Sequence, residues 1–192
     1  MDRKNKTCLP VVAIKSADLV ILVASAQFYQ IRKIDEYIAF SYAGNQPNGN
    51  DFFMHLVEEA GKYKFAYSTA CPMIRLVKHL CKKIQIRTQR YDRKPYDVEV
   101  LLTGCDDSGI HIYHIDSSGN FYECNAMAIG SGSKRACEYL EKLLLTNSEG
   151  ILCAEDELKS HGLQAFLDAC RNDEKNVIAT IGTKRRCEIS CE

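Results

Sequence analysis

Short apolar runs separated by polar residues fill the first quarter of the chain, a pattern typical of β-strands. Residues 10–14 and 19–24 form the first two runs, and the second is rich in β-branched side chains. Because the intervening residues 15–18 are mostly polar, the two runs predict a hairpin. A second strand pair is predicted over residues 32–34 and 37–43, ending at Gly44.

A helical period replaces the strand pattern further along the chain. Residues 45–50 contain a glycine, a proline and three asparagines, which is typical of a loop. We therefore expect a helix that begins after this loop, with Asp51 as its cap. Pro72 predicts the first turn of a second helix, whose apolar positions keep the helical period to about Gln89.

The second half of the chain repeats this order of strands and then helices. Strands are predicted over residues 97–102, 110–115, 121–124, 126–129, 177–181 and 187–190, and helices over residues 134–145 and 155–170. Strands clustered between helix pairs favour two stacked antiparallel sheets with two helices on each outer face. The sequence thus predicts an α+β fold, a four-layer αββα sandwich, and one domain over residues 1–192.

Composition narrows the classes of function. Lysine plus arginine and aspartate plus glutamate both number 25, so no net charge draws the chain toward nucleic acid or an anionic membrane. A local basic patch remains compatible with this neutral total. No apolar run reaches the length of a membrane span, so we expect a soluble intracellular protein with no nucleic-acid partner and no membrane partner.

Neither the cysteines nor the histidines predict a metal site. The ten cysteines are widely spaced without a CxxC pair, so buried free thiols are expected rather than structural zinc. His111 and His114 are three apart on a predicted strand and should face opposite sides of it. Asp106 and Asp107 lie beside Gly109, where a turn explains them without acid–base catalysis. No cofactor is expected.

Motifs between residues 88 and 132 are more specific than these patterns. The segment from Gln89 to Asp106 contains a Pro-Tyr pair and a Thr-Gly-Cys-Asp sequence, and two later segments contain Ser-Gly-Asn-Phe and Ala-Ile-Gly. Together these segments resemble the signatures of proteasome alpha subunits, in the same order over about residues 11–188. The signature positions are Pro95, Tyr96, Gly104, Asp106, Gly119 and Gly130.

Within that family, the segment from Tyr122 to Gly130, together with residues 157–163, most resembles the branch at the sixth ring position, termed alpha type-1 in some naming schemes. The resemblance implies the fold of the N-terminal nucleophile hydrolases. It also implies a place in the heptameric outer ring of the 20S proteasome, in the cytoplasm and nucleus. The implied partners are other alpha subunits, the beta ring, and the regulatory particle or activators, in ubiquitin-dependent protein degradation.

A catalytic role requires a nucleophile at the first residue of the first strand, whose own amine acts as the base. By the register of the resemblance that position is Leu9, which has no nucleophilic atom, so no catalytic residue is expected. Thr7 and Cys8 come just before it. Two alternatives remain open: a divergent beta-type peptidase in which Thr7 or Cys8 is unmasked, and an orphan paralogue outside the ring.

The resemblance also implies a docking role for two residues. Lys33 matches the alpha-subunit lysine that lines a pocket between neighbouring subunits, where it can pair with the terminal carboxylate of an activator. Gly44 matches a position of close backbone approach in the same pocket. The sequence departs from the family pattern at Lys94 and Asp97. It also predicts a chain shortened at its start, without the family's N-terminal helix and gating tail.

Overall fold

Two five-stranded antiparallel sheets form the centre of the computed structural model, which describes residues 9–25, 30–146, 155–170, 176–182 and 185–191. One sheet has the strand order β10-β9-β2-β1-β8 and the other β3-β4-β5-β6-β7. The strands are β1 (Val11–Lys15), β2 (Leu19–Ser25), β3 (Arg32–Asp35), β4 (Ile38–Gly44), β5 (Val98–Asp106), β6 (Gly109–Ile115), β7 (Phe121–Glu123), β8 (Ala126–Ile129), β9 (Asn176–Gly182) and β10 (Arg185–Cys191).

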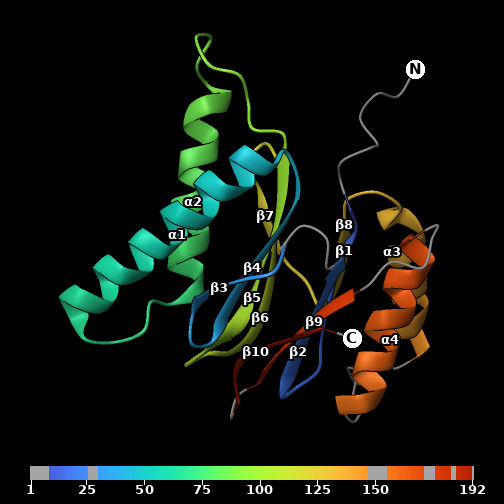
Figure 1. Ribbon diagram of the computed structural model, residues 1–192. Coiled ribbons are helices and arrows are strands. Elements are labelled where there is room, and N and C mark those ends of the chain that lie inside the picture. The colour runs from blue at the N-terminus through green and yellow to red at the C-terminus, as the bar shows by residue number, and fades with distance from the viewer. Residues whose placement is uncertain (1–8, 26–29, 147–154, 171–175, 183–184, 192) are drawn as a thin grey trace.

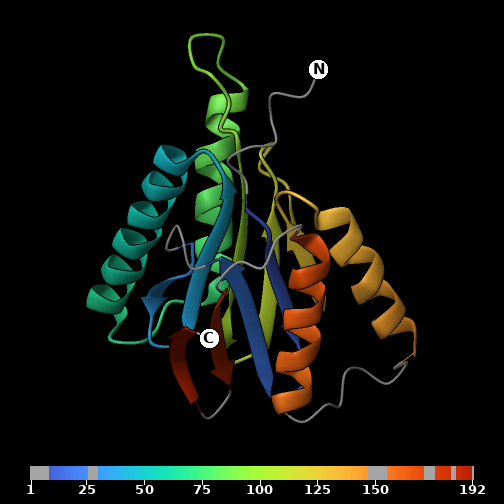
Figure 2. The same ribbon diagram turned by 45° about the vertical axis from the view of Figure 1, so that its right-hand side comes forward.

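Two helices cover the outer face of each sheet (Figures 1 and 2). Helices α1 (Gln46–Tyr67) and α2 (Met73–Thr88) pack on the sheet that contains β4 and β5. Helices α3 (Ser133–Thr146) and α4 (Glu155–Ala169) pack on the sheet that contains β1 and β2. The predicted four-layer αββα sandwich is therefore confirmed.

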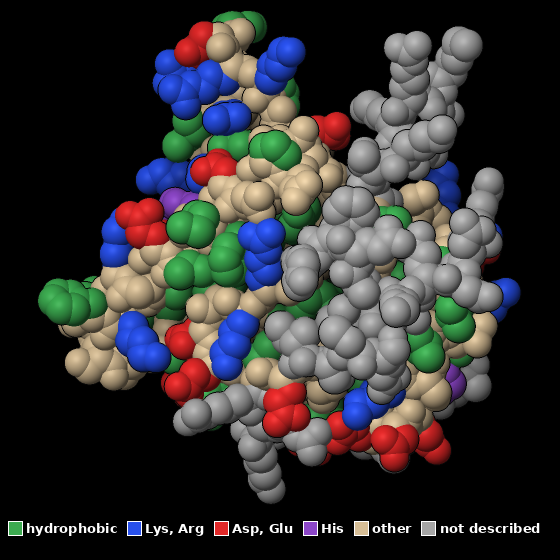
Figure 3. All heavy atoms as spheres, in the orientation of Figure 1, with side chains coloured by type: hydrophobic (Ala, Val, Ile, Leu, Met, Phe, Trp, Pro, Cys, Tyr) green, Lys and Arg blue, Asp and Glu red, His purple; other side chains and the backbone are tan. Residues whose placement is uncertain are grey.

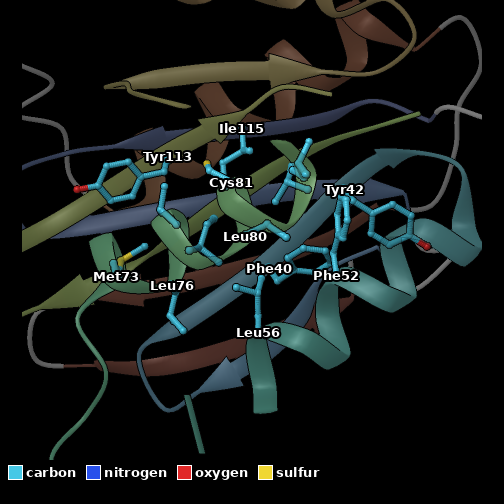
Figure 4. Packing of buried hydrophobic residues seen from close by; sticks show 14 of the residues in the cluster. Phe40, Tyr42, Phe52, Leu56, Met73, Leu76, Leu80, Cys81, Tyr113 and Ile115 are labelled. Carbon is cyan, nitrogen blue, oxygen red and sulfur yellow. The ribbon is translucent and has the colours of Figure 1, made fainter. Parts of the chain in front are cut away.

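Apolar side chains fill the three spaces between the four layers of helices and sheets. The alternation of side chains along each strand explains how these apolar layers form. On β4, Phe40 and Tyr42 point toward α1 and α2, whereas Ala39 and Ala43 point toward the other sheet. Figure 4 shows Phe40 packed with Phe52 and Leu56 of α1, and Leu76 and Leu80 of α2 in the same layer. Because side chains alternate across a strand, each sheet supplies one face to each neighbouring layer.

The start of α1 differs from the sequence prediction. Residues 46–50 belong to the helix rather than to a loop, and the N-cap is Asn45, whose side chain accepts a hydrogen bond from the Asn48 N–H at 3.3 Å. Asp51 lies inside the helix and does not cap it. The glycine that favoured a loop has a packing role instead. A Cβ on Gly49 would lie 2.5 Å from the ring of Tyr42.

Candidate functional site

The candidate nucleophile position lies beside the last turn before α3. Leu9 is half-buried and lies two residues before the start of the first strand, and its carbonyl lies against Gly130. A Cβ at Gly130 would come within 2.5 Å of this carbonyl oxygen, so the signature glycine permits the contact. Leucine offers no hydroxyl, thiol or amine for attack. Thr7 and Cys8 lie outside the described residues.

The two candidate docking residues lie on the strand pair β3–β4 but at different points along it. Lys33 is exposed and pairs across the ladder with Ala39, five residues before Gly44. At about 3.3 Å per residue, roughly 16 Å of strand separates Ala39 from Gly44. Among the described residues, no carboxylate lies within ion-pair distance of the Lys33 ammonium. One copy of the chain therefore does not bring both residues into a single pocket.

Gly44 adopts a backbone conformation that residues with a side chain rarely adopt. Its φ is +128°, and a Cβ there would lie 2.4 Å from the carbonyl oxygen of Asp97. The same carbonyl accepts a hydrogen bond from the Asn45 N–H at 2.9 Å. Glycine is thus required for β4 to pass closely beside the start of β5 and turn into α1.

Tyr96 ties the loop after α2 to both helices. Its side chain is buried, and its hydroxyl donates a hydrogen bond to Asp51 Oδ2 at 3.1 Å. The ring packs edge-on against Phe52 with centroids 4.5 Å apart, and the Arg87 guanidinium lies 4.1 Å from the ring centroid. Burial, followed by the nearby Asp51 carboxylate, raises the pKa of the Tyr96 phenol. Pro95 is exposed.

Asp106 joins the end of β5 to the start of α2. Its Oδ2 accepts a hydrogen bond from the Met73 N–H at 3.2 Å, which satisfies one of the free donors of the helix. Its other oxygen accepts from both the backbone N–H and the hydroxyl of Ser108. Burial alone would raise the pKa of Asp106, but these hydrogen bonds and the nearby His111 lower it. The aspartate ends a strand and caps a helix, where the sequence predicted only a turn.

Ser108, His111 and Glu123 form a chain of contacts that resembles a catalytic triad. His111 Nε2 lies 2.8 Å from the Ser108 hydroxyl oxygen, and His111 Nδ1 lies 2.8 Å from Glu123 Oε1. The Ser108 hydroxyl has a single proton and lies within hydrogen-bond distance of both Asp106 Oδ1 and His111 Nε2, so the Asp106 carboxylate competes with the imidazole for that proton. Lys15 Nζ, 3.3 Å from Glu123, extends the network to the other sheet. The geometry therefore indicates a structural link between the sheets.

The other signature glycines mark close approaches of backbone. A Cβ on Gly104 would lie 2.4 Å from the carbonyl oxygen of Tyr37, and one on Gly119 would lie 3.1 Å from the Cys81 carbonyl oxygen in α2. Gly132, which is not one of the signature positions, is comparable, since its Cβ would lie 2.2 Å from the Ala169 carbonyl oxygen. Arg135 donates a hydrogen bond to that same carbonyl at 2.9 Å. These contacts hold the β3–β4 turn against β5, the turn after β6 against α2, and the turn before α3 against the end of α4.

Metal ligands and membrane spans are the remaining candidate features of the described part of the chain. No group of three or more histidine, cysteine or acidic side chains there is arranged to hold a metal ion. His111 and His114 face opposite sides of β6, because His111 stacks on Tyr113 of the helix-facing side. None of the helices in the described ranges is long and apolar enough to span a bilayer.

The fold and the leucine at the nucleophile position together define the class of protein. Two stacked antiparallel sheets between two helix pairs form the sandwich of the N-terminal nucleophile hydrolases, here with leucine at the position matched to the nucleophile. The family model described as proteasome subunit matches residues 4–181. The chain therefore belongs to the proteasome subunit family.

The curated relatives that the chain resembles are alpha-type subunits. The chain is 37% identical over 172 residues to proteasome subunit alpha type-1 of Drosophila melanogaster, covering 85% of this chain and 61% of the relative. It is 32% identical to the alpha type-1 subunit of Dictyostelium discoideum, covering 85% and 68%. It is also 32% identical to the alpha type-6 subunit of Saccharomyces cerevisiae, covering 80% and 67%. The chain thus spans about three fifths to two thirds of these relatives.

Proposed function

We propose that the chain is a non-catalytic alpha-type subunit of the 20S proteasome outer ring, formed as one domain over residues 1–192. The leucine at the nucleophile position carries the non-catalytic part of this proposal. The relatives, which are named alpha-type subunits, support the ring position. The subunit would contribute to assembly, to the antechamber and to the docking of regulatory caps in ubiquitin-dependent protein degradation, in the cytoplasm and nucleus.

Exposed apolar side chains on the outer helices support the proposal that the chain has partners in a ring. Phe65 is 92% exposed and Tyr67 60% exposed at the end of α1, and Leu145 is 82% exposed in α3. In an assembled ring, neighbouring subunits would cover such side chains on both outer layers. The proposed partners are neighbouring alpha subunits in a heptameric ring and the beta ring beneath them.

Lys33 is the proposed contact for an activator. It is exposed on an edge strand, and its ammonium has no carboxylate partner within the described residues, so it is available for a terminal carboxylate. Because Gly44 lies far from Lys33 along β4, a pocket that uses both would combine this chain with a neighbouring subunit. The Lys33→Ala variant should assemble normally but bind activator less tightly, whereas Lys78→Ala on α2 should change neither property.

Native mass spectrometry of the tagged protein purified from its own cells tests the proposal. We expect recovery in a particle of many different subunits with the mass of a complete barrel. Recovery as a lone monomer would contradict the ring role and favour an orphan paralogue. N-terminal sequencing of the same material tests the peptidase alternative, which requires removal of all residues before Thr7 or Cys8. Fractionation of the same cells checks the proposed compartments.

A further inference from the structure

One segment of the chain carries a strong positive charge that the neutral total conceals. Residues 73–94 contain eight lysines and arginines and one aspartate, a net charge of +7. Since the whole chain has 25 charges of each sign, the remaining residues carry a net charge of −7. Figure 3 shows Lys and Arg side chains gathered at the upper left, over the C-terminal end of α2 and the loop that follows it. The basic residues are Arg75, Lys78, Lys82, Lys83, Arg87, Arg90, Arg93 and Lys94.

Part of this segment lines a hollow of about 450 Å³ between α1, α2 and the loop before β5. Four cations border it: Lys82, Lys83, Arg87 and Arg93. One carboxylate, Asp51, lies on the α1 side. We call this hollow the α1–α2 basic pocket. Its formal charge, with the histidines neutral, is therefore +3.

Contacts within the pocket hold two of its cations in place. Lys83 Nζ lies 2.9 Å from Asp51 Oδ1, and the Tyr96 hydroxyl donates to the other oxygen of the same carboxylate. Arg87 is held with its guanidinium over the Tyr96 ring. Side chains that are already oriented lose less conformational freedom when a ligand binds. The carboxylate is thus engaged by Lys83 and Tyr96, whereas the Arg87 fork remains oriented at the pocket.

The other two cations lack a strong partner. Among the described residues no carboxylate lies within 4 Å of the Lys82 ammonium, and Arg93 reaches only the exposed Asp92, at 4.0 Å. Like charges brought together in a concave site repel one another and attract a counter-ion. The ligand that fits must therefore be compact and carry about three negative charges within the volume of the hollow.

We propose that the α1–α2 basic pocket binds a compact polyphosphate anion, with a di- or triphosphate group as the chemical class. Arginine presents a planar fork of donors that matches phosphate oxygens, and lysine supplies a point charge to the same group. A triphosphate carries its negative charges on the oxygens of adjacent phosphate groups, whereas carboxylates would need several side chains to converge in the same space. A hollow of about 450 Å³ has the size of a small-molecule site, which favours such a ligand over an extended nucleic-acid strand.

Calorimetric titration of the full chain with sodium tripolyphosphate tests the proposal. We expect one saturable site per chain. Lys82→Ala and Arg93→Ala should each weaken binding by about tenfold or more, as expected for loss of a charge-assisted hydrogen bond. Lys78→Ala is the matched control, because it removes the same charge from the same helix outside the pocket. Its affinity should stay within about twofold of the unmodified chain, with only the general salt effect of one lost charge.

Three outcomes would overturn the proposal. The first is the absence of saturable binding by a chain that melts cooperatively. The second is equal weakening by Lys78→Ala and Lys82→Ala, which would show general attraction to the basic segment rather than a site. The third is displacement of tripolyphosphate by single-stranded RNA at lower concentration, which would identify a polynucleotide surface. None of these outcomes bears on ring assembly, so the proposed function is tested separately.

Discussion

At the scale of single residues, the signature positions act mainly by allowing close contact. Gly44 lets β4 pass the Asp97 carbonyl, and Gly130 lets the turn before α3 meet the carbonyl of Leu9. Neither residue offers a group that could take part in chemistry. The family motif at these positions therefore reflects backbone geometry, and its role in function is to hold surfaces in place.

Replacing Gly44 by alanine tests this interpretation. The new Cβ would meet a backbone oxygen at 2.4 Å and the residue would keep a positive φ, so we expect the free energy of unfolding to fall by roughly 2 kcal/mol or more. Gly61→Ala is the control, because nothing lies within 4 Å of its Cβ position in α1. That change should stabilise the chain by about 0.5–1 kcal/mol. Urea denaturation of both variants measures the difference, and two shifts of the same sign would contradict the prediction.

His114 predicts a dependence of stability on pH. It lies between the two sheets and its Nε2 is buried without a hydrogen-bond partner in the described part of the chain. Burial lowers the pKa of His114 below its ordinary value of 6.5, although Glu99 and Asp116 act in the opposite direction. The unfolded chain therefore binds the proton first, so stability should fall as pH decreases below about 6.5.

The His114→Leu variant should flatten this profile, because it removes the group that must stay neutral in the folded chain. Some slope should persist, since burial also lowers the pKa of His55. Thermal unfolding between pH 7.5 and pH 5 measures the effect. A profile in the variant as steep as in the unmodified chain would show that His114 does not cause the loss.

At the scale of elements, a side chain from a distant strand caps one helix, and a loop residue ties two helices together. Asp106, at the end of β5, caps α2 through the Met73 N–H, and Tyr96 holds the loop after α2 against α1. The N-cap residue of α2 is Pro72, which makes no side-chain cap bond. The cap of this helix is therefore supplied by the sheet it covers, which fixes the position of the helix on the sheet.

Removing the Asp106 carboxylate should weaken this link. We expect Asp106→Ala to lower the free energy of unfolding by about 1–2 kcal/mol, the usual cost of losing a helix cap. Asp107→Ala, an exposed neighbour of the same charge, should change it by less than about 0.5 kcal/mol. Hydrogen exchange of the first amides of α2 should increase in Asp106→Ala alone. Equal losses in the two variants would contradict a capping role.

At the scale of the whole molecule, three apolar layers stabilise the sandwich, and other apolar side chains remain on its surface. Phe166 of α4 is fully buried against the β1–β2 sheet, whereas Phe65 of α1 is 92% exposed. The first side chain can contribute only to folding. The second contributes little to folding and is available for a partner surface.

Alanine variants of these two phenylalanines should separate folding from assembly. Phe166→Ala should cost about 3–5 kcal/mol because it leaves a cavity in a packed layer. Phe65→Ala should leave the unfolding midpoint of the isolated chain unchanged and reduce recovery of the chain in assembled particles. Differential scanning calorimetry and quantitative mass spectrometry measure the two effects. Normal recovery of Phe65→Ala would exclude this part of α1 from the assembly surface.

Local patterns in the sequence were sufficient to predict the layers of the fold. Strand alternation and helical period identified each strand and helix that the described residues form, because each element must bury one face wherever it packs. The boundary of α1 was wrong, because Pro47 and Gly49 have loop preferences that the packing of Tyr42 overrides. The signature residues were found by family resemblance, while their contacts could not be inferred from local pattern.

The sequence by itself thus determined the sandwich, the leucine at the nucleophile position and membership of the family, because these depend on residue identity and short-range order. Only the tertiary structure decided that Asp106 caps α2 and that Lys33 and Gly44 lie apart on one strand pair. It also decided that Asp51 and Arg93, 42 positions apart in the sequence, line one basic pocket. Such contacts depend on how helices and sheets pack, and packing brings together side chains whose separation along the chain gives no sign of their proximity.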